Sequence, residues 1–177
     1  MKKILPLIIT LFLVNSAFAQ VKNAVTKSTI TFQLKNLGIN TGGKIGGLQA
    51  NIDFNPAQLG SSVIEANADV NTVNTDNDSR DTHLKSADFF DVARFPKITM
   101  KSVSFKHKSG DYYVGVFNLT MKDKTKPVEV PFSYVGVDKT AVIKGSFKIN
   151  RLDFGVGGKS MVMSDDVTVN IELEVAR

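Results

Sequence analysis

A regular alternation of apolar and polar residues recurs along this chain and constrains its fold more than any other feature. Every second residue is apolar in LQANIDF (48–54), and VTVNIELEV (167–175) continues the same spacing over a longer stretch. A period of two places successive side chains on opposite faces of an extended strand, so each segment predicts a β-strand with one buried face. Eight segments are predicted to be strands: 29–35, 48–54, 64–70, 97–106, 112–121, 127–136, 141–150 and 167–175. Within 97–106 the apolar positions change frame, from Ile98 and Met100 to Val103 and Phe105, which predicts a β-bulge.

Eight strands joined mostly by short turns predict an antiparallel sheet that closes into a barrel, because closure removes exposed strand edges. At eight strands a barrel is either filled by its own side chains or holds one slender ligand. A two-sheet sandwich predicts the same alternation, so both architectures stay open at this point. Several residues on the apolar faces are small, namely Ala50, Ala66, Ala68 and Gly145. They either leave room along the axis or fit tightly against larger neighbours.

The first nineteen residues have the three parts of a signal peptide. A basic start at 1–3 precedes an apolar run at 4–14, and Ala-Phe-Ala at 17–19 has the spacing that signal peptidase recognises. The apolar run is shorter than the roughly 20 residues that cross a bilayer core. We therefore expect cleavage after residue 19 and a mature single domain, residues 20–177, in the periplasm or secreted.

Composition argues against several classes of function. Basic and acidic residues, 22 and 17 in number, are interspersed, which is typical of a solvated surface and not of a nucleic-acid-binding stripe. The chain has no Cys, and its two His, His83 and His107, are too few for a His-based metal site. No Gly-x-Ser-x-Gly turn occurs, and GGKS at 157–160 lacks phosphate-loop spacing. We predict no metal, no catalytic residue and no nucleic-acid partner.

One segment, 79–90, interrupts the strand pattern and predicts a short helix. Asn77, Asp78 and Ser79 offer N-cap oxygens, and residues 80–90 contain no Gly or Pro. Pro96 then favours an extended chain into the next strand. We expect this helix to lie across one end of the barrel.

Residues 80–102, RDTHLKSADFFDVARFPKITMKS, resemble the signature of the YceI-like family of exported, lipocalin-like bacterial proteins. The resemblance continues through STITF (28–32), IDFNP (52–56), TKPV (125–128), RLDFG (151–155) and SDDV (164–167), and covers essentially the whole mature chain. It departs at Met100, where the family usually has an aromatic residue, and at 123–124, where the family usually has a Gly-containing turn.

The resemblance implies an all-β, eight-stranded antiparallel lipocalin-like barrel whose apolar lumen binds a long amphiphile. The expected ligand is a polyisoprenoid or an isoprenoid quinone precursor, with no cofactor besides this lipid. The function would be non-enzymatic binding and sequestration or transport. The alternative is a structural or interaction protein with a filled barrel, which docks a membrane or redox partner through its rim. Transient membrane contact and a homodimer are further interactions that this interpretation allows.

The predicted lumen residues are large apolar side chains on the dry faces of the strands. They are Phe32, Leu34, Leu48, Ile52, Phe54, Ile64, Val70, Phe132, Phe147, Ile149, Val169 and Ile171. A second group is predicted at the mouth, as a headgroup site or as a brace for the helix. Its members are Arg80, Asp81, His83, Leu84, Phe90, Arg151 and Asp153.

The charged members of the mouth group have two interpretations. A guanidinium binds oxyanions in a bidentate manner, so Arg80, Arg94 or Arg151 would suit a phosphate headgroup. The favoured interpretation pairs Arg80 and Arg151 with Asp81 or Asp153, which would hold the helix against the strands. For His83, a buried or capping hydrogen-bond donor is favoured over a catalytic group.

Overall fold

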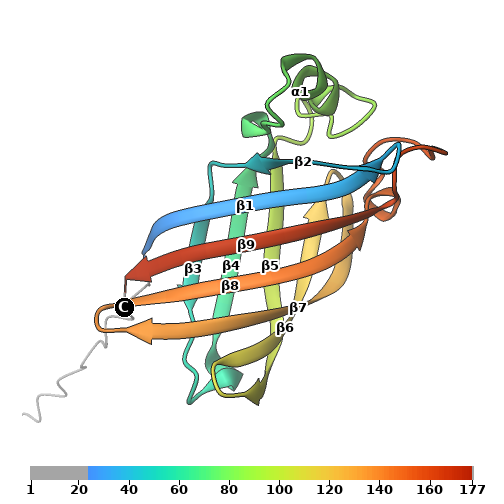
Figure 1. Cartoon of the computed structure of the whole chain (residues 1–177). Helices are drawn as coiled ribbons and strands as arrows, with labels where there is room; N and C mark the ends of the chain where they lie inside the picture. The colour runs from blue at the N-terminus through green and yellow to red at the C-terminus, as the bar shows by residue number, and fades with distance from the viewer. Residues whose placement is uncertain (1–23, 177) are drawn as a thin grey trace, which may run out of the picture.

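The computed structural model describes residues 24–176, and the predicted signal peptide at 1–19 lies outside the described residues. The described part forms one antiparallel sheet of nine strands, with a short α-helix at one end (Figure 1). The strands are β1 (Val25–Asn36), β2 (Ile39–Ile45), β3 (Gln49–Asp53), β4 (Val63–Asp69), β5 (Lys97–Ser109), β6 (Tyr112–Met121), β7 (Lys124–Val137), β8 (Thr140–Asn150) and β9 (Asp166–Ala176). The helical elements are α1 (Asp78–Lys85) and the 3-10 turns η1 (Leu59–Ser61), η2 (Val70–Thr72) and η3 (Arg151–Phe154).

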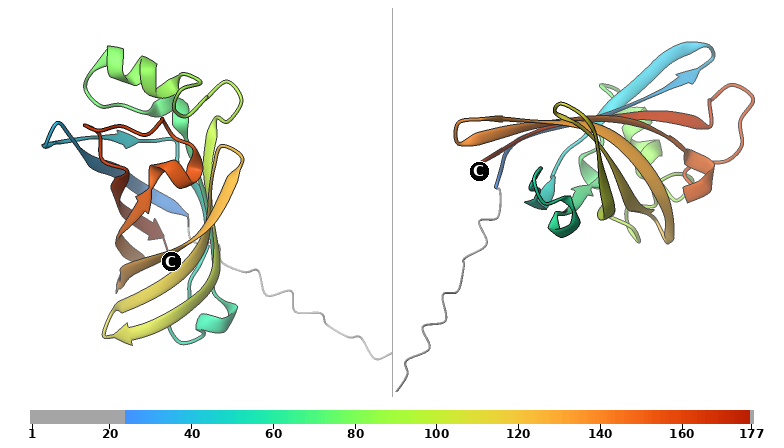
Figure 2. Two further views of the ribbon diagram at one scale, coloured as in Figure 1. Left: turned by 90° about the vertical axis from the view of Figure 1, so that its right-hand side faces the viewer. Right: turned by 90° about the horizontal axis from the view of Figure 1, so that it is seen from below.

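The sheet curls into a half-barrel. Its strand order is β2-β1-β9-β8-β7-β6-β5-β4-β3, and all neighbours are antiparallel. Strands β1, β9 and β8 cross β3, β4 and β5 at a steep angle, so the sheet wraps around a central space (Figures 1 and 2). The predicted all-β antiparallel fold with one short helix is confirmed.

The expectation of full closure was wrong, because the edge strands β2 and β3 are not paired with each other in the described part of the chain. The β2 edge meets the segment after β4 instead. Lys44 and Asn74 exchange backbone hydrogen bonds of 2.8 and 3.0 Å, and the Asp69 amide donates to the Gly46 carbonyl over 3.2 Å. These bonds cover part of the edge that a closed barrel would have paired.

Strand β2 makes the count nine where the sequence predicts eight. Its sequence, INTGGKI, lacks an apolar alternation and contains two glycines. Both glycines are required by close approach: a Cβ at Gly42 would collide with the Phe32 carbonyl of β1, and one at Gly43 would collide with the Asn74 carbonyl. The two glycines that allow these close contacts also interrupt the apolar alternation, which is why the sequence pattern did not predict this strand.

The predicted bulge and helix differ in outcome. A register shift between Ser102 and Ser104 of β5 confirms a bulge where the apolar pattern changes frame. The helix is shorter than the predicted 79–90, because Ser86 adopts an extended conformation after α1 ends at Lys85. Residues 86–95 continue as turns, in which the Phe90 amide donates to the Leu84 carbonyl over 3.0 Å. None of the helices in residues 24–176 has the length and apolar character needed to cross a membrane.

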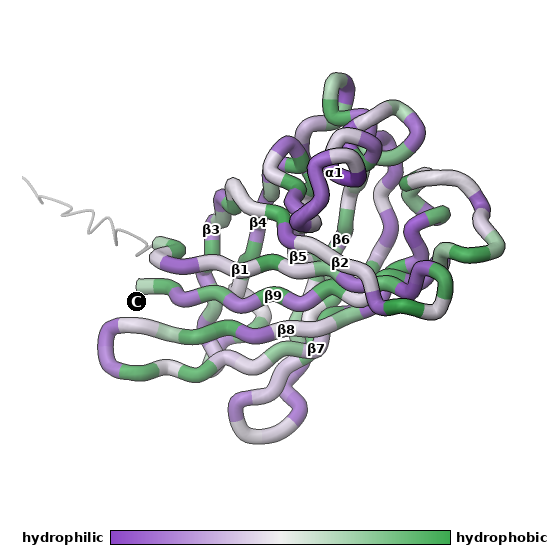
Figure 3. Tube along the Cα trace, turned by 45° about the horizontal axis from the view of Figure 1, so that its top comes forward, coloured by the Kyte–Doolittle hydropathy of each residue, from purple (hydrophilic) through white to green (hydrophobic). Residues whose placement is uncertain are grey.

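The hydrophobic core lies on the concave side of the sheet. Along β8, the buried Ile143, Phe147 and Ile149 alternate with the exposed Lys144 and Lys148. The same alternation of hydropathy is visible along β8 and β9 in Figure 3. The inner surface that encloses the central space is therefore almost entirely hydrocarbon.

Candidate functional site: an elongated apolar cavity

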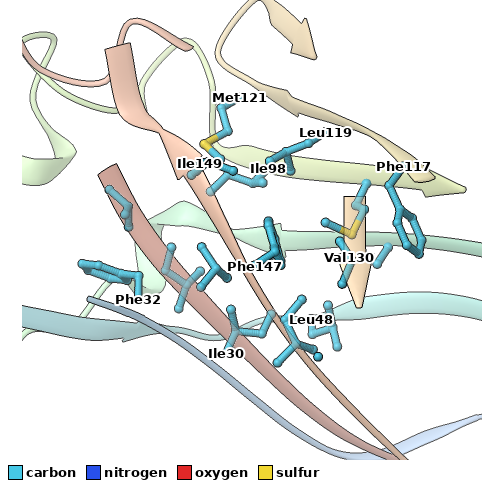
Figure 4. A pocket seen from close by; sticks show the side chains of 18 of the residues that line it. Ile30, Phe32, Leu48, Ile98, Phe117, Leu119, Met121, Val130, Phe147 and Ile149 are labelled. Carbon is cyan, nitrogen blue, oxygen red and sulfur yellow. The ribbon is translucent and has the colours of Figure 1, made fainter. Parts of the chain in front are cut away.

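A cavity lined by hydrocarbon side chains lies inside the half-barrel. All nine strands contribute to it, together with residues from the segments 84–90 and 151–163. Figure 4 shows side chains such as Phe32, Phe147 and Leu119 gathered around this space from different strands. Among the lining residues of the described chain, only Asn67 and Arg151 have polar side chains.

The cavity is large and elongated. The space open to the centres of water molecules is about 200 Å³, whereas a single water needs only about 10–15 Å³ on this measure. Ile143, Gly145, Phe147 and Ile149 of β8 all line it. Six residue steps of about 3.3 Å give a lining about 20 Å long on this strand. The half-barrel is therefore not filled by its own side chains.

Ten of the twelve predicted lumen residues line the cavity. They are Phe32, Leu34, Leu48, Ile52, Ile64, Phe132, Phe147, Ile149, Val169 and Ile171. The other two lie elsewhere. Val70 is buried in η2, where the chain has already left β4, and Phe54 belongs to the aromatic cluster described below.

Sequence reasoning missed the contribution of β5 and β6. These strands supply Ile98, Met100, Phe117, Leu119 and Met121 to the lining. Their apolar alternation along 97–106 and 112–121 is the signal that could have identified them. Met100, one of the departures from the family pattern, places a flexible thioether in the wall.

Aromatic side chains close one end of the cavity. Phe54 is buried, and its ring centroid lies 5.2 Å from Phe105, 5.1 Å from Tyr113, 5.3 Å from Phe132 and 4.9 Å from Tyr134. Three of these four contacts are edge-to-face, an arrangement that aromatic pairs prefer. Phe132 lines the cavity, whereas Phe54 contacts Phe132 and does not itself line the cavity. We call these five residues the aromatic floor.

The opposite end, the mouth, is bordered by two segments that touch each other. Leu84, Phe89 and Phe90 from the α1 region line the cavity, as do Val156 and Met163 from the segment before β9. The two segments meet where the Phe89 ring packs over Gly157, because a Cβ at that glycine would lie only 2.7 Å from the ring. Gly157 also has a φ of 70°, a conformation that favours glycine.

Arg80 and Asp81 converge on Thr75 and do not pair with each other directly, contrary to the favoured sequence interpretation. The Arg80 guanidinium donates to the Thr75 hydroxyl (Nε, 2.8 Å) and to the Thr75 carbonyl (Nη2, 2.7 Å). The Asp81 carboxylate accepts from the Thr75 amide over 2.9 Å and from its hydroxyl over 2.5 Å. Thr75 is buried, so these bonds fix the start of α1 to the rim. Neither Arg80 nor Asp81 lines the cavity.

Arg151 also has a different partner from the predicted Asp153. Its Nη2 lies 2.8 Å from Oδ1 of Asp165, and its remaining bonds go to the carbonyls of Ser164, Val156 and Gly158. Four of the five guanidinium N–H groups are thereby used. Arg151 is 4% exposed and holds the segment 156–165 in place. It acts as a brace, while Asp153 is exposed in η3.

His83 and Arg94 lie on the outside of the mouth. The predicted buried or capping role of His83 was wrong: its side chain is largely exposed, 3.6 Å from the Asp88 carboxylate, with its ring 4.9 Å from that of Phe89. Arg94 pairs with Asp91 over 3.4 Å and is exposed as well. Of the seven predicted mouth residues, Leu84, Phe90 and Arg151 line the cavity.

Titratable groups are sparse around this cavity. Residues 24–176 contain no group of three or more His, Asp or Glu side chains arranged to hold a metal ion. The pKa of Asp69 is lowered, chiefly because the Asn71 side chain and amide donate hydrogen bonds to its carboxylate. Asp69 caps η2 and is absent from the lining. The arrangement favours binding through apolar contact over acid-base chemistry.

Comparison with known proteins agrees with this architecture. Residues 22–175 match the YceI-like domain. Protein YceI of Salmonella arizonae is 29% identical over 152 residues, which cover 82% of this chain and 79% of that protein. BcnA of Burkholderia cenocepacia has the same fold, with a TM-score of 0.80 and 23% identity over 83% of this chain and 95% of BcnA. A polyisoprenoid binding domain from Saccharophagus degradans superposes with a TM-score of 0.64 and 15% identity, covering 88% and 97% of the two chains. The match to the family model spans nearly the whole chain, which therefore belongs to the YceI-like family.

Proposed function

We propose that this protein binds a long isoprenoid lipid in its cavity, and sequesters or carries it without chemical change. The observation that carries the proposal is the elongated cavity, whose lining within residues 24–176 includes only two polar side chains. Burial of a hydrocarbon tail there is favourable by about 0.8 kcal/mol per CH₂ and needs no directional partner. The polyisoprenoid binding domain of the same fold supports an isoprenoid as the class of tail.

The tail, and not the headgroup, is the part of the ligand that this cavity selects. In the described part of the chain, Arg151 is the only charged residue in the lining, and four of its N–H groups are engaged by the protein. Arg80 is engaged by Thr75 and is absent from the lining. The headgroup therefore stays at the mouth, and an isoprenoid alcohol, phosphate or quinone would bind through a similar tail.

The same cavity favours a lipid carrier over the alternative of a structural or interaction protein with a filled barrel. A protein that only docks a partner through its rim would not need an unfilled interior. A non-enzymatic role is consistent with the polyisoprenoid binding domain that has the same fold. We place this function in the periplasm or outside the cell, on the basis of the signal-peptide pattern in residues 1–19.

Loading with defined lipids tests the proposal. Protein stripped by organic extraction and refolded would be mixed with a long isoprenoid alcohol, with the matching quinone, or with a short-chain alcohol. The proposal expects stoichiometric uptake of both long isoprenoids and little uptake of the short one. Failure of both long isoprenoids to bind, by a correctly refolded protein, would exclude it.

A further inference from the structure

Four large apolar side chains are exposed together at one end of the molecule. Leu37 lies in the turn between β1 and β2, and Ile39 is the first residue of β2; they are 71% and 69% exposed. Met161 is fully exposed and Val162 is half exposed in the segment that precedes β9. Figure 1 shows this turn and this segment beside each other, at the end where β1 finishes and β9 begins. We call these four residues the apolar tip.

Backbone pairing joins the two halves of the apolar tip into one unit. The Leu37 amide donates to the Val162 carbonyl over 2.8 Å, and Asn36 forms a β-bridge with Met163. The Ser164 amide adds a 2.8 Å bond to the Lys35 carbonyl. The tip is therefore held by the sheet as a fixed surface.

Leu37 is in a conformation that its residue type disfavours. Its φ is 51°, and Gly38 follows with a φ of 77°, which is the pattern of a two-residue hairpin turn with both central residues left-handed. Asn or Asp is strongly preferred at the first of these positions, and an exposed leucine there gains nothing from burial within the chain. A partner outside the chain would explain a leucine at this position.

The apolar tip continues into the mouth of the cavity. Met163 directly follows Val162 and lines the cavity, as does Val156 earlier in the same segment. The Phe89 ring packs over Gly157 of this segment, so the segment that carries half of the tip touches the α1 region at this end of the cavity. The apolar tip therefore lies beside the mouth.

The charges around the tip indicate which partner it fits. The segments 35–43 and 155–163, which carry all four tip residues, contain Lys35 and Lys159 and no Asp or Glu; the nearest acidic residues along the chain are Asp153 and Asp165, and Asp165 is paired with Arg151. Both lysines are exposed. Apolar side chains bordered by lysines are suited to the interface of an anionic bilayer, where the side chains enter the acyl boundary and the lysines meet phosphates.

We propose that the apolar tip inserts into the surface of an anionic phospholipid bilayer and brings the cavity mouth against it. This inference rests on the proposed lipid-binding function, because docking then lets an isoprenoid tail pass between bilayer and cavity without crossing water. It adds a membrane partner and a defined contact surface to that function.

Vesicle sedimentation with a matched pair of variants tests the inference. In the tip variant, Leu37→Asn and Met161→Ser remove two apolar side chains, and the first change installs a residue that the turn prefers, so folding is preserved. The control variant, Val103→Ser and Val137→Ser, removes two exposed valines outside the tip. Vesicles would contain phosphatidylcholine, either alone or with phosphatidylglycerol.

We expect wild type and the control variant to sediment with phosphatidylglycerol vesicles, more weakly at high salt. We expect the tip variant to bind these vesicles about tenfold or more weakly, since it loses the burial of two apolar groups. Equal sedimentation of the tip variant and wild type would overturn the inference. So would a tip-dependent dimer in solution without vesicle binding, because the tip would then be covered by a second copy.

A loading measurement from ethanol solution separates this inference from the proposed function. If both wild type and the tip variant take up a long isoprenoid alcohol from ethanol, while only wild type takes it from phosphatidylglycerol vesicles, both proposals stand. Uptake from ethanol without any vesicle binding by wild type would overturn membrane docking alone. No uptake from either source would overturn the lipid-binding function itself.

Discussion

Arg151 and Asp165 form an ion pair, with 2.8 Å between Nη2 and Oδ1, that ties the end of β8 to the start of β9; its guanidinium is buried and its carboxylate is partly exposed. The pair belongs to a network in which the guanidinium also holds three carbonyl groups of the segment between these strands. That segment supplies Val156 and Met163 to the cavity and half of the apolar tip. Removal of the Arg151 side chain should therefore disturb both the cavity lining and the apolar tip.

Arg151→Met is expected to lower the free energy of unfolding by about 3–5 kcal/mol, because a partly buried carboxylate and three carbonyls lose their donor. Lys144→Met is the matched control, since Lys144 and Glu172 form an ion pair in which both side chains are exposed, 59% and 57%. Its loss should cost less than about 1 kcal/mol. Urea denaturation of both variants measures the difference, and equal losses would show that Arg151 does not brace the mouth.

The aromatic floor should set the longest tail that the cavity accepts. Phe54→Ala removes the ring behind Phe132 and should let longer isoprenoid alcohols bind, at a stability cost of about 3–5 kcal/mol. Phe154→Ala is a suitable control, because Phe154 is about as buried as Phe54 but lies in η3 and does not belong to the aromatic floor. Competition within a mixture of isoprenoid alcohols of increasing length would be followed by native mass spectrometry. The same preferred length in Phe54→Ala and Phe154→Ala would contradict the role of the floor.

Filling the cavity should abolish lipid binding while the fold is retained. Ala66 lines the cavity from β4 and is only half buried, so Ala66→Phe places its ring in the empty space. We expect the stoichiometry of bound isoprenoid to fall sharply, with the melting temperature unchanged or raised because a void is filled. Ala57→Phe, in an exposed loop, serves as the control. Full occupancy of Ala66→Phe would place the ligand elsewhere.

The contacts of Thr75 should control how firmly α1 is held at the rim. Thr75→Val keeps the shape but removes the hydroxyl that joins Arg80 to Asp81, which should cost about 1–3 kcal/mol. Amide hydrogen exchange in residues 78–85 should speed up more than in β8 or β9. Thr82→Val, which removes an exposed hydroxyl bond to the Asp78 carbonyl, should leave exchange nearly unchanged. Uniform acceleration across the sheet would mean that Thr75 stabilises the whole fold.

Most of the fold follows from the alternation in the sequence, because a period of two fixes which face of a strand is buried. Strand β2 does not show this alternation, since Gly42 and Gly43 serve close backbone contact and leave no apolar signal. The early end of α1 has no local signal either. Residues 86–90 have no helix breaker, but their turns bring Phe89 and Phe90 onto the cavity.

The sequence predicts the apolar residues that line the cavity better than it predicts the hydrogen-bond partners of the charged residues. Phe32 and Ile171 lie on strands in which apolar and polar residues alternate, so the local pattern predicts that their side chains face the cavity. The choice of Asp165 over Asp153 as the partner of Arg151 depends on how the chain folds back between β8 and β9. The convergence of Arg80 and Asp81 on Thr75 depends likewise on the turn before α1. The spacing of residues in the sequence does not show how the chain runs in either of these two segments.

The central claim is that the half-barrel holds a lipid, and native mass spectrometry tests it most directly. The protein would be purified from the periplasm of an expressing bacterium without detergent, then measured before and after organic extraction. We predict one extra mass per chain, removed by extraction and identified by fragmentation as an isoprenoid, and lost in Ala66→Phe. A folded wild-type protein that carries no such mass, and that takes up none when offered a long isoprenoid, would contradict the claim.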